Sequence, residues 1–123
     1  MTDFWKKIKH FKKEEFSCRC GCGLNIINKD LVKKLDKARD LANTSFFITS
    51  ACRCISHNNS IKGSITSSHL DGLAVDIDIE SSSKRYKVLY SLFAVGFSRI
   101  GIYSDFVHAD IDIEKPKNMI WYK

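Results

Sequence analysis

Two short segments of the sequence alternate acidic or imidazole side chains with apolar ones. In residues 73–79 (LAVDIDI), the acidic positions are Asp76 and Asp78. In residues 107–113 (VHADIDI), the polar positions are His108, Asp110 and Asp112. Because successive side chains of a β-strand point to opposite faces, each segment predicts one apolar and one polar face. If the two strands are neighbours, one face of the sheet carries a histidine and four aspartates.

So many carboxylates on one face need compensation, because like charges repel and are costly to bury unpaired. Water, arginine or a metal cation could supply it, and antiparallel sheets often leave one face exposed to water. His69 favours the cation, because Gly72 permits a turn that brings its imidazole back over the strand that holds Asp76. Two imidazoles and one carboxylate, with a fourth position left for water, are typical of catalytic zinc. We therefore predict one zinc ion bound by His69, Asp76 and His108.

The elements that must position these residues follow from hydrophobic periodicity. The pattern predicts helices over residues 3–12, 29–42 and 82–95, with Asn28 as an N-cap and Asn43 and Gly96 as helix ends. It predicts strands over residues 46–49, 73–79, 99–103 and 106–113, and loops over 17–25 and 55–68. The tail with Trp121 is expected to pack back on the sheet. This order indicates an α+β fold in one domain, residues 1–123, with a mainly antiparallel sheet and flanking helices.

The chain has a net charge of +6, and its lysines concentrate near the N-terminus. Five of them are Lys6, Lys7, Lys9, Lys12 and Lys13. Such a run is either a solvated helix face or a surface that attracts an anionic polymer such as a bacterial wall. The first fifteen residues lack the apolar segment of a signal peptide, and no stretch is long enough to span a membrane. We expect a protein made in the cytoplasm without a leader, and no membrane insertion.

The five cysteines fall into two clusters, which are Cys18, Cys20 and Cys22, and Cys52 and Cys54. Structural zinc, a disulfide and free thiols are all open interpretations. An odd cysteine count argues against a complete disulfide framework. Structural zinc ligands are usually separated by two to four intervening residues. The cysteines of each cluster here are separated by one, which weighs against a structural zinc site.

The residues of the predicted metal site also carry a family resemblance. Residues 67–76 (SSHLDGLAVD) read S-x-H-x-x-G-x-A-x-D, and residues 106–110 read F-V-H-A-D. Both resemble motifs of the D-alanyl-D-alanine carboxypeptidase family of zinc peptidases, in the form typical of its short bacterial and phage members.

Further elements extend the resemblance over roughly residues 14–121. Residues 49–54 (TSACRC) resemble the family's T-S-G-Y-R-C element, with alanine and cysteine where glycine and tyrosine are usual, which removes an aromatic ring near the expected substrate pocket. Asn58 or Asn59 matches the asparagine that often follows. Residues 16–23 are similar to an F-x-C-x-C-G-C-G segment.

The resemblance implies a fold shared with the hedgehog signalling domain and cleavage of peptidoglycan stem peptides. It implies that His69, Asp76 and His108 are the zinc ligands. By the same resemblance Arg53 would hold a substrate carboxylate or carbonyl, the alternative being that it pairs with the aspartates. Asp105, three positions before the last histidine, would be the general base. Asp110 is the reserve candidate, although orienting a ligand suits it better.

We therefore expect a monomeric zinc peptidase, of the D,D-carboxypeptidase, endopeptidase or endolysin type, that acts on the cell wall after release. Its partner is a peptidoglycan peptide and not nucleic acid. A first rival is a catalytically inactive hedgehog-like module that binds a cell wall or another ligand. A second is a small nucleic-acid-binding protein built around the cysteines, which leaves the alternating strands unexplained.

Overall fold

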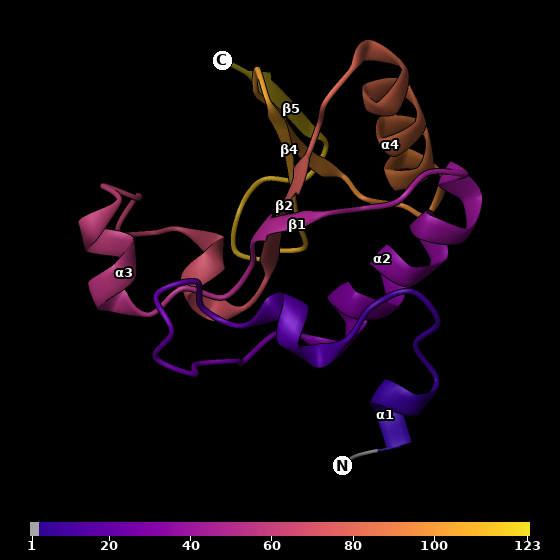
Figure 1. The fold of residues 1–123 in the computed structure, drawn as a ribbon. Helices are drawn as coiled ribbons and strands as arrows, with labels where there is room; N and C mark the ends of the chain where they lie inside the picture. The colour runs from indigo at the N-terminus through magenta and orange to yellow at the C-terminus, as the bar shows by residue number, and fades with distance from the viewer. Residues whose placement is uncertain (1–2) are drawn as a thin grey trace.

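The computed structural model describes residues 3–123, in which five strands form one sheet (Figure 1). The strands are β1 (Ile48–Ser50), β2 (Ala74–Asp78), β3 (Arg99–Ile102), β4 (Phe106–Asp110) and β5 (Met119–Tyr122). The helices are α1 (Asp3–Lys6), α2 (Lys29–Ala42), α3 (Ile55–Ser60) and α4 (Ser82–Ala94), with short 3-10 turns η1 (Lys13–Phe16) and η2 (Ser68–Asp71). The predicted α+β class is confirmed.

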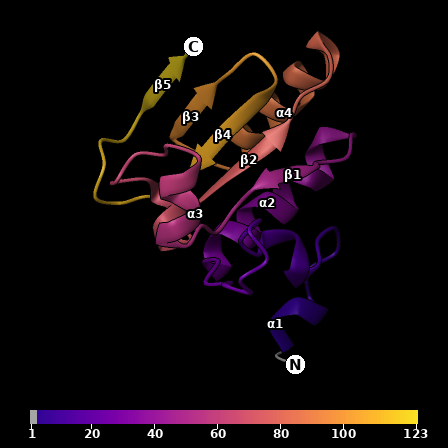
Figure 2. The same cartoon turned by 60° about the vertical axis from the view of Figure 1, so that its left-hand side comes forward.

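The strand order across the sheet is β1-β2-β4-β3-β5, which Figure 2 shows from β1 at one edge to β5 at the other. The pairings β1–β2, β2–β4 and β3–β4 are antiparallel, whereas β3–β5 is parallel. The sheet is therefore mixed, and the expectation of a mainly antiparallel sheet is confirmed only in part. The parallel pair arises because the chain passes over the end of the sheet after β4 and returns beside β3.

Helices α2 and α4 pack together on one face of the sheet, while α3 lies on the other side (Figures 1 and 2). The alternation read from the sequence explains this, because the odd-numbered side chains of β2 and β4 are fully buried under the two helices. They join apolar residues of α2 and α4 in one core, whose members include Val75, Ile77, Val107, Ala109, Leu31, Leu35, Val88 and Leu92. The even-numbered side chains of both strands are left for the opposite face.

Helix α2 has the bounds that the sequence predicts. The side chain of Asn28 accepts hydrogen bonds from the backbone N–H groups of Asp30 and Leu31, and Asn43 ends the helix with a left-handed backbone. The second long helix, α4, begins after Ser81 and ends before Gly96, close to the predicted bounds.

The N-terminal helix is much shorter than the predicted 3–12. The backbone N–H groups of Lys9 and His10 donate to the carboxylate of Asp36 on α2, at 3.0 and 2.9 Å. These N–H groups are therefore used in a tertiary contact instead of a helical turn. The contact lets Phe11 enter the core, where it is 5% exposed.

Three further boundaries differ from the prediction, and one of them is the end of β4, which lies at Asp110 instead of residue 113. The segment 55–68, predicted as a loop, contains α3 and the start of η2. Strand β1 begins at Ile48 and not at Phe46, because Phe46 is buried against Phe11 while Phe47 is 64% exposed.

The tail packs on the sheet as predicted, and Trp121 lies beside Gly101 in the β3–β5 pair. A Cβ atom on Gly101 would lie 2.6 Å from the indole nitrogen of Trp121. Glycine here lets the indole lean across β3 toward His108, whose ring centroid is 5.5 Å away. No helix among residues 3–123 has the length and apolar character needed to cross a bilayer.

The turn that delivers His69 to the sheet depends on Gly72. Gly72 has a φ of +69°, and a Cβ atom there would overlap the backbone carbonyl of Ile26. We expect Gly72→Ala to lower the free energy of unfolding by about 2–3 kcal/mol, because it combines a strained backbone with a clash against immobile atoms. Urea denaturation provides the measurement.

Gly96→Ala is the matched control, because Gly96 also has a positive φ, +95°, but a Cβ atom there meets only the flexible end of Lys34. This variant should lose about 1 kcal/mol, the cost of the backbone conformation alone. Equal losses in the two variants would contradict the importance of the Ile26 contact.

Candidate metal centre

The three predicted zinc ligands converge at the polar face of the sheet. Antiparallel pairing sets Asp76 of β2 directly opposite His108 of β4, and η2 delivers His69 from the loop before β2. One ligand atom from each residue lies within 4.8 Å of the other two. Oδ1 of Asp76 is 3.0 Å from Nδ1 of His108 and 3.3 Å from Nε2 of His69. The structure therefore brings together all three residues that the sequence singled out.

The orientation of the His69 ring is fixed by a hydrogen bond on the side that faces away from Asp76. Its Nδ1 lies 2.7 Å from the backbone carbonyl of Ala51, and since a carbonyl only accepts, Nδ1 carries the proton. A neutral ring then presents the lone pair of Nε2 to the carboxylate of Asp76. Two electron pairs that face each other at 3.3 Å require a proton or a metal cation between them. The residue is 3% exposed, so water contributes little to this compensation.

His108 is held in the same manner by a carboxylate. Its Nε2 lies 2.8 Å from Oδ2 of Asp110, which leaves Nδ1 directed at Asp76. The other oxygen of Asp110 accepts hydrogen bonds from Arg99 at 2.8 Å and from the backbone N–H of Asp112 at 3.1 Å. Outer partners of this kind fix the tautomer and ring orientation of histidines that bind metals. Asp110 therefore has the orienting position that the sequence assigned to it in preference to general base.

The protonation of the centre reflects burial and these contacts. Burial alone would raise the pKa of the Asp76 carboxyl, but hydrogen bonds with His108 and His69 hold it well below its usual range. Burial alone would lower the pKa of His108, but hydrogen bonds to Asp110 and Asp76 raise it above its usual value. Asp76 is thus an ionised, buried carboxylate surrounded by proton donors. A divalent cation fits such a donor set, because it can replace the protons that the imidazoles share with Asp76.

The centre lies in a cavity of about 270 Å³. Cationic and aromatic side chains line its walls in addition to the metal-ligand set. These are Arg53, Arg99, Lys115, Tyr103, Phe106 and Trp121. A cavity with a few convergent polar groups and an aromatic wall is typical of a small-ligand or peptide site.

Arg53 lies at the edge of the metal centre. Its Nη2 is 3.5 Å from Oδ2 of Asp76, so the pairing with an aspartate that the sequence left open is present. The guanidinium is also held by the side chains of Ser50 and Asn58, each at 3.2 Å. Of the two asparagines considered from the sequence, Asn58 is the buried one that contacts Arg53, and Asn59 is exposed.

Asp105, the predicted general base, lies in the turn between β3 and β4. It is exposed, and it is not among the residues that line the cavity. Its backbone carbonyl accepts a hydrogen bond from Ile79 at 2.9 Å. Its neighbour Phe106 lines the cavity, so Asp105 stands next to the cavity wall but outside it. Its role as a base stays a prediction.

The remaining aspartates of the predicted polar face lie outside the metal set. Asp112 accepts a hydrogen bond from Ser68 at 2.8 Å and pairs with Lys115 at 3.7 Å. Asp78 is half-buried and does not line the cavity.

Several supporting groups were not predicted from the sequence. The Ala51 carbonyl belongs to the backbone and has no sequence signal. Arg99 comes from β3, which pairs with β4, and Trp121 comes from β5, which pairs with β3, so both pairings had to be known first. The guanidinium of Arg99 lies 5.1 Å from the Trp121 ring. The available clue to the ion pair with Asp110 was Arg99 itself, which lies in a predicted strand next to the strand that holds Asp110.

Comparison with known proteins gave one result. The sequence profile of the family described as Peptidase M15 matches residues 9–110. A search of curated proteins found no match. The matched range contains the three metal ligands, Arg53 and all five cysteines.

Substitution of Asp110 tests its orienting role. We expect Asp110→Asn to weaken zinc binding at this centre by about 10- to 100-fold, because the amide holds the His108 ring less firmly than a carboxylate. Asp78→Asn removes a carboxylate from the same sheet region without touching a ligand, and it should leave the affinity unchanged. Competition with a chromogenic chelator measures both, with circular dichroism to check folding. Equal affinities in the two variants would refute the assignment.

Proposed function

This chain belongs to the peptidase M15 family, the zinc D-Ala-D-Ala carboxypeptidase-like peptidases, and from that premise we propose that it hydrolyses stem peptides of peptidoglycan with one zinc ion. His69, Asp76 and His108 would hold the ion. The observation that carries the proposal is that Nε2 of His69 and Nδ1 of His108 both face the same Asp76 oxygen, each ring being fixed by an acceptor on its far side.

When bound, zinc supplies a Lewis acid that activates water and polarises the scissile carbonyl. The protein's own contribution is to fix the ligands before the substrate arrives. The Ala51 carbonyl holds the ring of His69, and Asp110 holds the ring of His108. Arg99 forms an ion pair with Asp110. The short connections leave little freedom to reorganise, and this pre-organisation is what an electrostatic catalyst requires.

Arg53 is proposed to bind the substrate. With a cation bound to Asp76, the carboxylate would hold the guanidinium less strongly, and the positive charge of Arg53 would be available to a substrate at the cavity wall. Its planar fork suits a peptide carboxylate or carbonyl. Ser50 and Asn58 keep it in place, so the entropy cost of ordering a long side chain is met before binding.

The aromatic wall of the cavity supports a peptide substrate of limited size. Tyr103 and Phe106 stack with ring centroids 4.3 Å apart, and the indole N–H of Trp121 donates to the Tyr103 hydroxyl at 3.1 Å while its ring lies next to His108. We propose a single hedgehog-like peptidase domain over residues 1–123 that acts as a monomer. Its role would be that of a D,D-carboxypeptidase, an endopeptidase or a phage endolysin that reaches the wall after release.

The direct test is digestion of purified peptidoglycan, followed by mass spectrometry of the released muropeptides. We expect new stem-peptide termini from the zinc-loaded protein, loss of release on adding a chelator, and recovery on adding zinc. His69→Ala should lower the rate by at least about 10³-fold, since the metal and its chemistry are lost together.

His57→Ala is the matched control, because His57 lies on α3 and does not line the cavity. It should retain the rate of the unaltered chain. Zinc bound at this centre without release of any muropeptide would instead favour the inactive binding module.

Asp105 is proposed as the general base on the support of its position three residues before His108 and next to Phe106 of the cavity wall. Asp105→Asn should lower kcat by about 10²- to 10⁴-fold without loss of zinc, because the amide cannot accept a proton. Steady-state kinetics on a muropeptide, with metal analysis of the same sample, measures both quantities. Ser104→Ala, in the same turn, should leave kcat unchanged. A kcat for Asp105→Asn close to that of Ser104→Ala would exclude Asp105 as the base.

A further inference from the structure

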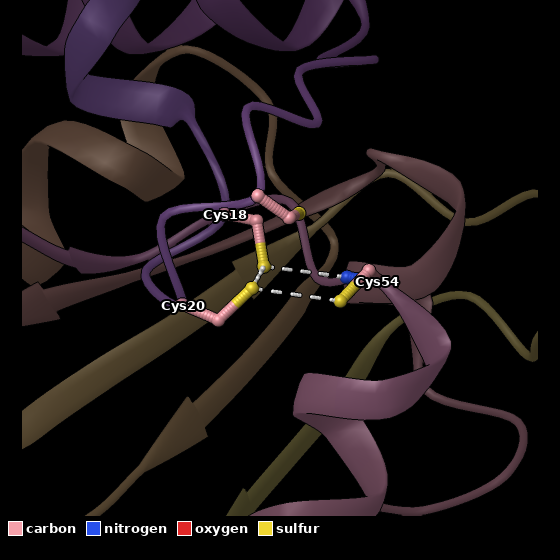
Figure 3. Close-up of side chains that lie close together, drawn as sticks. Cys18, Cys20 and Cys54 are labelled. Carbon is pink, nitrogen blue, oxygen red and sulfur yellow. Dashed lines mark hydrogen bonds between the residues drawn. The ribbon is translucent and has the colours of Figure 1, made fainter.

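A second group of possible metal ligands lies outside the cavity, where the loop after η1 meets the segment before α3 (Figure 3). The sulfur atoms of four cysteines all lie within 4.8 Å of one another. The cysteines are Cys18, Cys20, Cys22 and Cys54. Sγ of Cys20 is 3.5 Å from that of Cys18 and 3.7 Å from that of Cys54. The fifth cysteine, Cys52, is buried and is not part of this group.

The two distances from Cys20 are close to those of a tetrahedral thiolate site, and the other sulfurs lie within 4.8 Å of one another. Four sulfurs at about 2.3 Å from a zinc ion lie about 3.8 Å from one another. A disulfide requires sulfurs about 2.05 Å apart, and it would use only two of the four. Two disulfides are a poor alternative, because three of the four cysteines lie within five consecutive residues. A single ion accounts for all four sulfurs at once.

The backbone shows why one-residue gaps do not prevent this arrangement. Gly21, between Cys20 and Cys22, has a φ of +86°, and its N–H donates to the carbonyl of Cys18 at 3.3 Å in a turn that leaves the sulfurs of Cys20 and Cys22 within 4.8 Å of each other. The spacing argument from the sequence assumed an ordinary backbone between the cysteines. Gly21 removes that assumption.

Backbone N–H groups also point at the sulfurs, as thiolate ligands require. The N–H of Cys54 lies 3.4 Å from Sγ of Cys18, a contact that Figure 3 shows, and the N–H of His57 lies 3.3 Å from Sγ of Cys54. These donors come from the start of α3, where N–H groups have no partner within the helix. They stabilise negative charge on two sulfurs from different parts of the chain.

We propose that these four cysteines bind one structural zinc ion, separate from the ion of the peptidase centre. The site is closed, because four protein ligands leave no position for water, so its role is to hold segments together. It joins the loop 18–22 to the segment 51–54. That segment supplies the Ala51 carbonyl, which orients His69, and Arg53, which contacts Asp76. The proposal stands independently of the proposed hydrolytic function.

Metal content of the full chain, purified with a non-chelating reductant, provides the test. We expect two zinc ions per chain in the unaltered protein and one in the double variant Cys20→Ser/Cys22→Ser, whose changes fall at exposed positions. Cys52→Ala removes the one cysteine outside the cluster and should keep two. His69→Ala should keep the ion of the cysteine site, so failure of this proposal and failure of the peptidase proposal are distinguishable.

Cobalt substitution identifies the ligands without relying on a variant that folds. The unaltered chain and His69→Ala should both show the intense thiolate-to-cobalt charge-transfer absorption of a tetrathiolate centre, and zinc should protect four thiols from alkylation. One zinc per chain with all five thiols reactive would overturn the proposal. So would a disulfide among the four cysteines in the reduced preparation, detected as a mass lower by two hydrogens.

Discussion

The register of β2 against β4 is the constraint on which both the core and the candidate metal centre depend. It sets Asp76 opposite His108, and it sets Val75 opposite Ala109 on the other face. A slip by one residue would move the carboxylate and imidazole into the apolar layer under α2 and α4. The free energy of burying the apolar face therefore also fixes the positions of Asp76 and His108, two of the candidate metal ligands.

The same register explains how the carboxylates of the polar face coexist. Asp76, Asp110 and Asp112 each have their own positive or hydrogen-bonding partners, and no single cation serves all three. Asp76 is matched by two imidazoles and Arg53, and Asp110 by His108 and Arg99. Asp112 lies beyond the end of β4 and is matched by Ser68 and Lys115. The repulsion expected from the sequence is thus resolved by a chain of ion pairs that ends at the candidate metal centre.

A feature could be predicted from the sequence where the residues that determine it lie close together in the chain. Helix α2 was predicted to the residue, because Asn28 and Asn43 cap it and its apolar stripe repeats at helical spacing. The meeting of His69, Asp76 and His108 was predicted, because strand alternation and the sequence motifs both depend on residues that are close together in the chain. The N-terminal helix was predicted too long, because Asp36, 27 residues after Lys9, captures backbone N–H groups. Helix α3 was missed, because its cap is the sulfur of Cys54 and not one of the usual oxygen-bearing residues.

The segment 51–54 connects the cysteine cluster to the candidate metal centre. It contains Cys54 of the cluster, and its Ala51 and Arg53 contact His69 and Asp76. The segment lies outside the regular sheet, so strand pairing alone does not hold it. Two of its backbone N–H groups donate outside the segment, that of Cys52 to the carbonyl of Phe16 and that of Arg53 to the carbonyl of His69. Yet the ring of His69 and the guanidinium of Arg53 both depend on its position. A chain of 123 residues has a small core, and a cross-link formed by four sulfurs at this point would stabilise the part of the centre that the sheet leaves free.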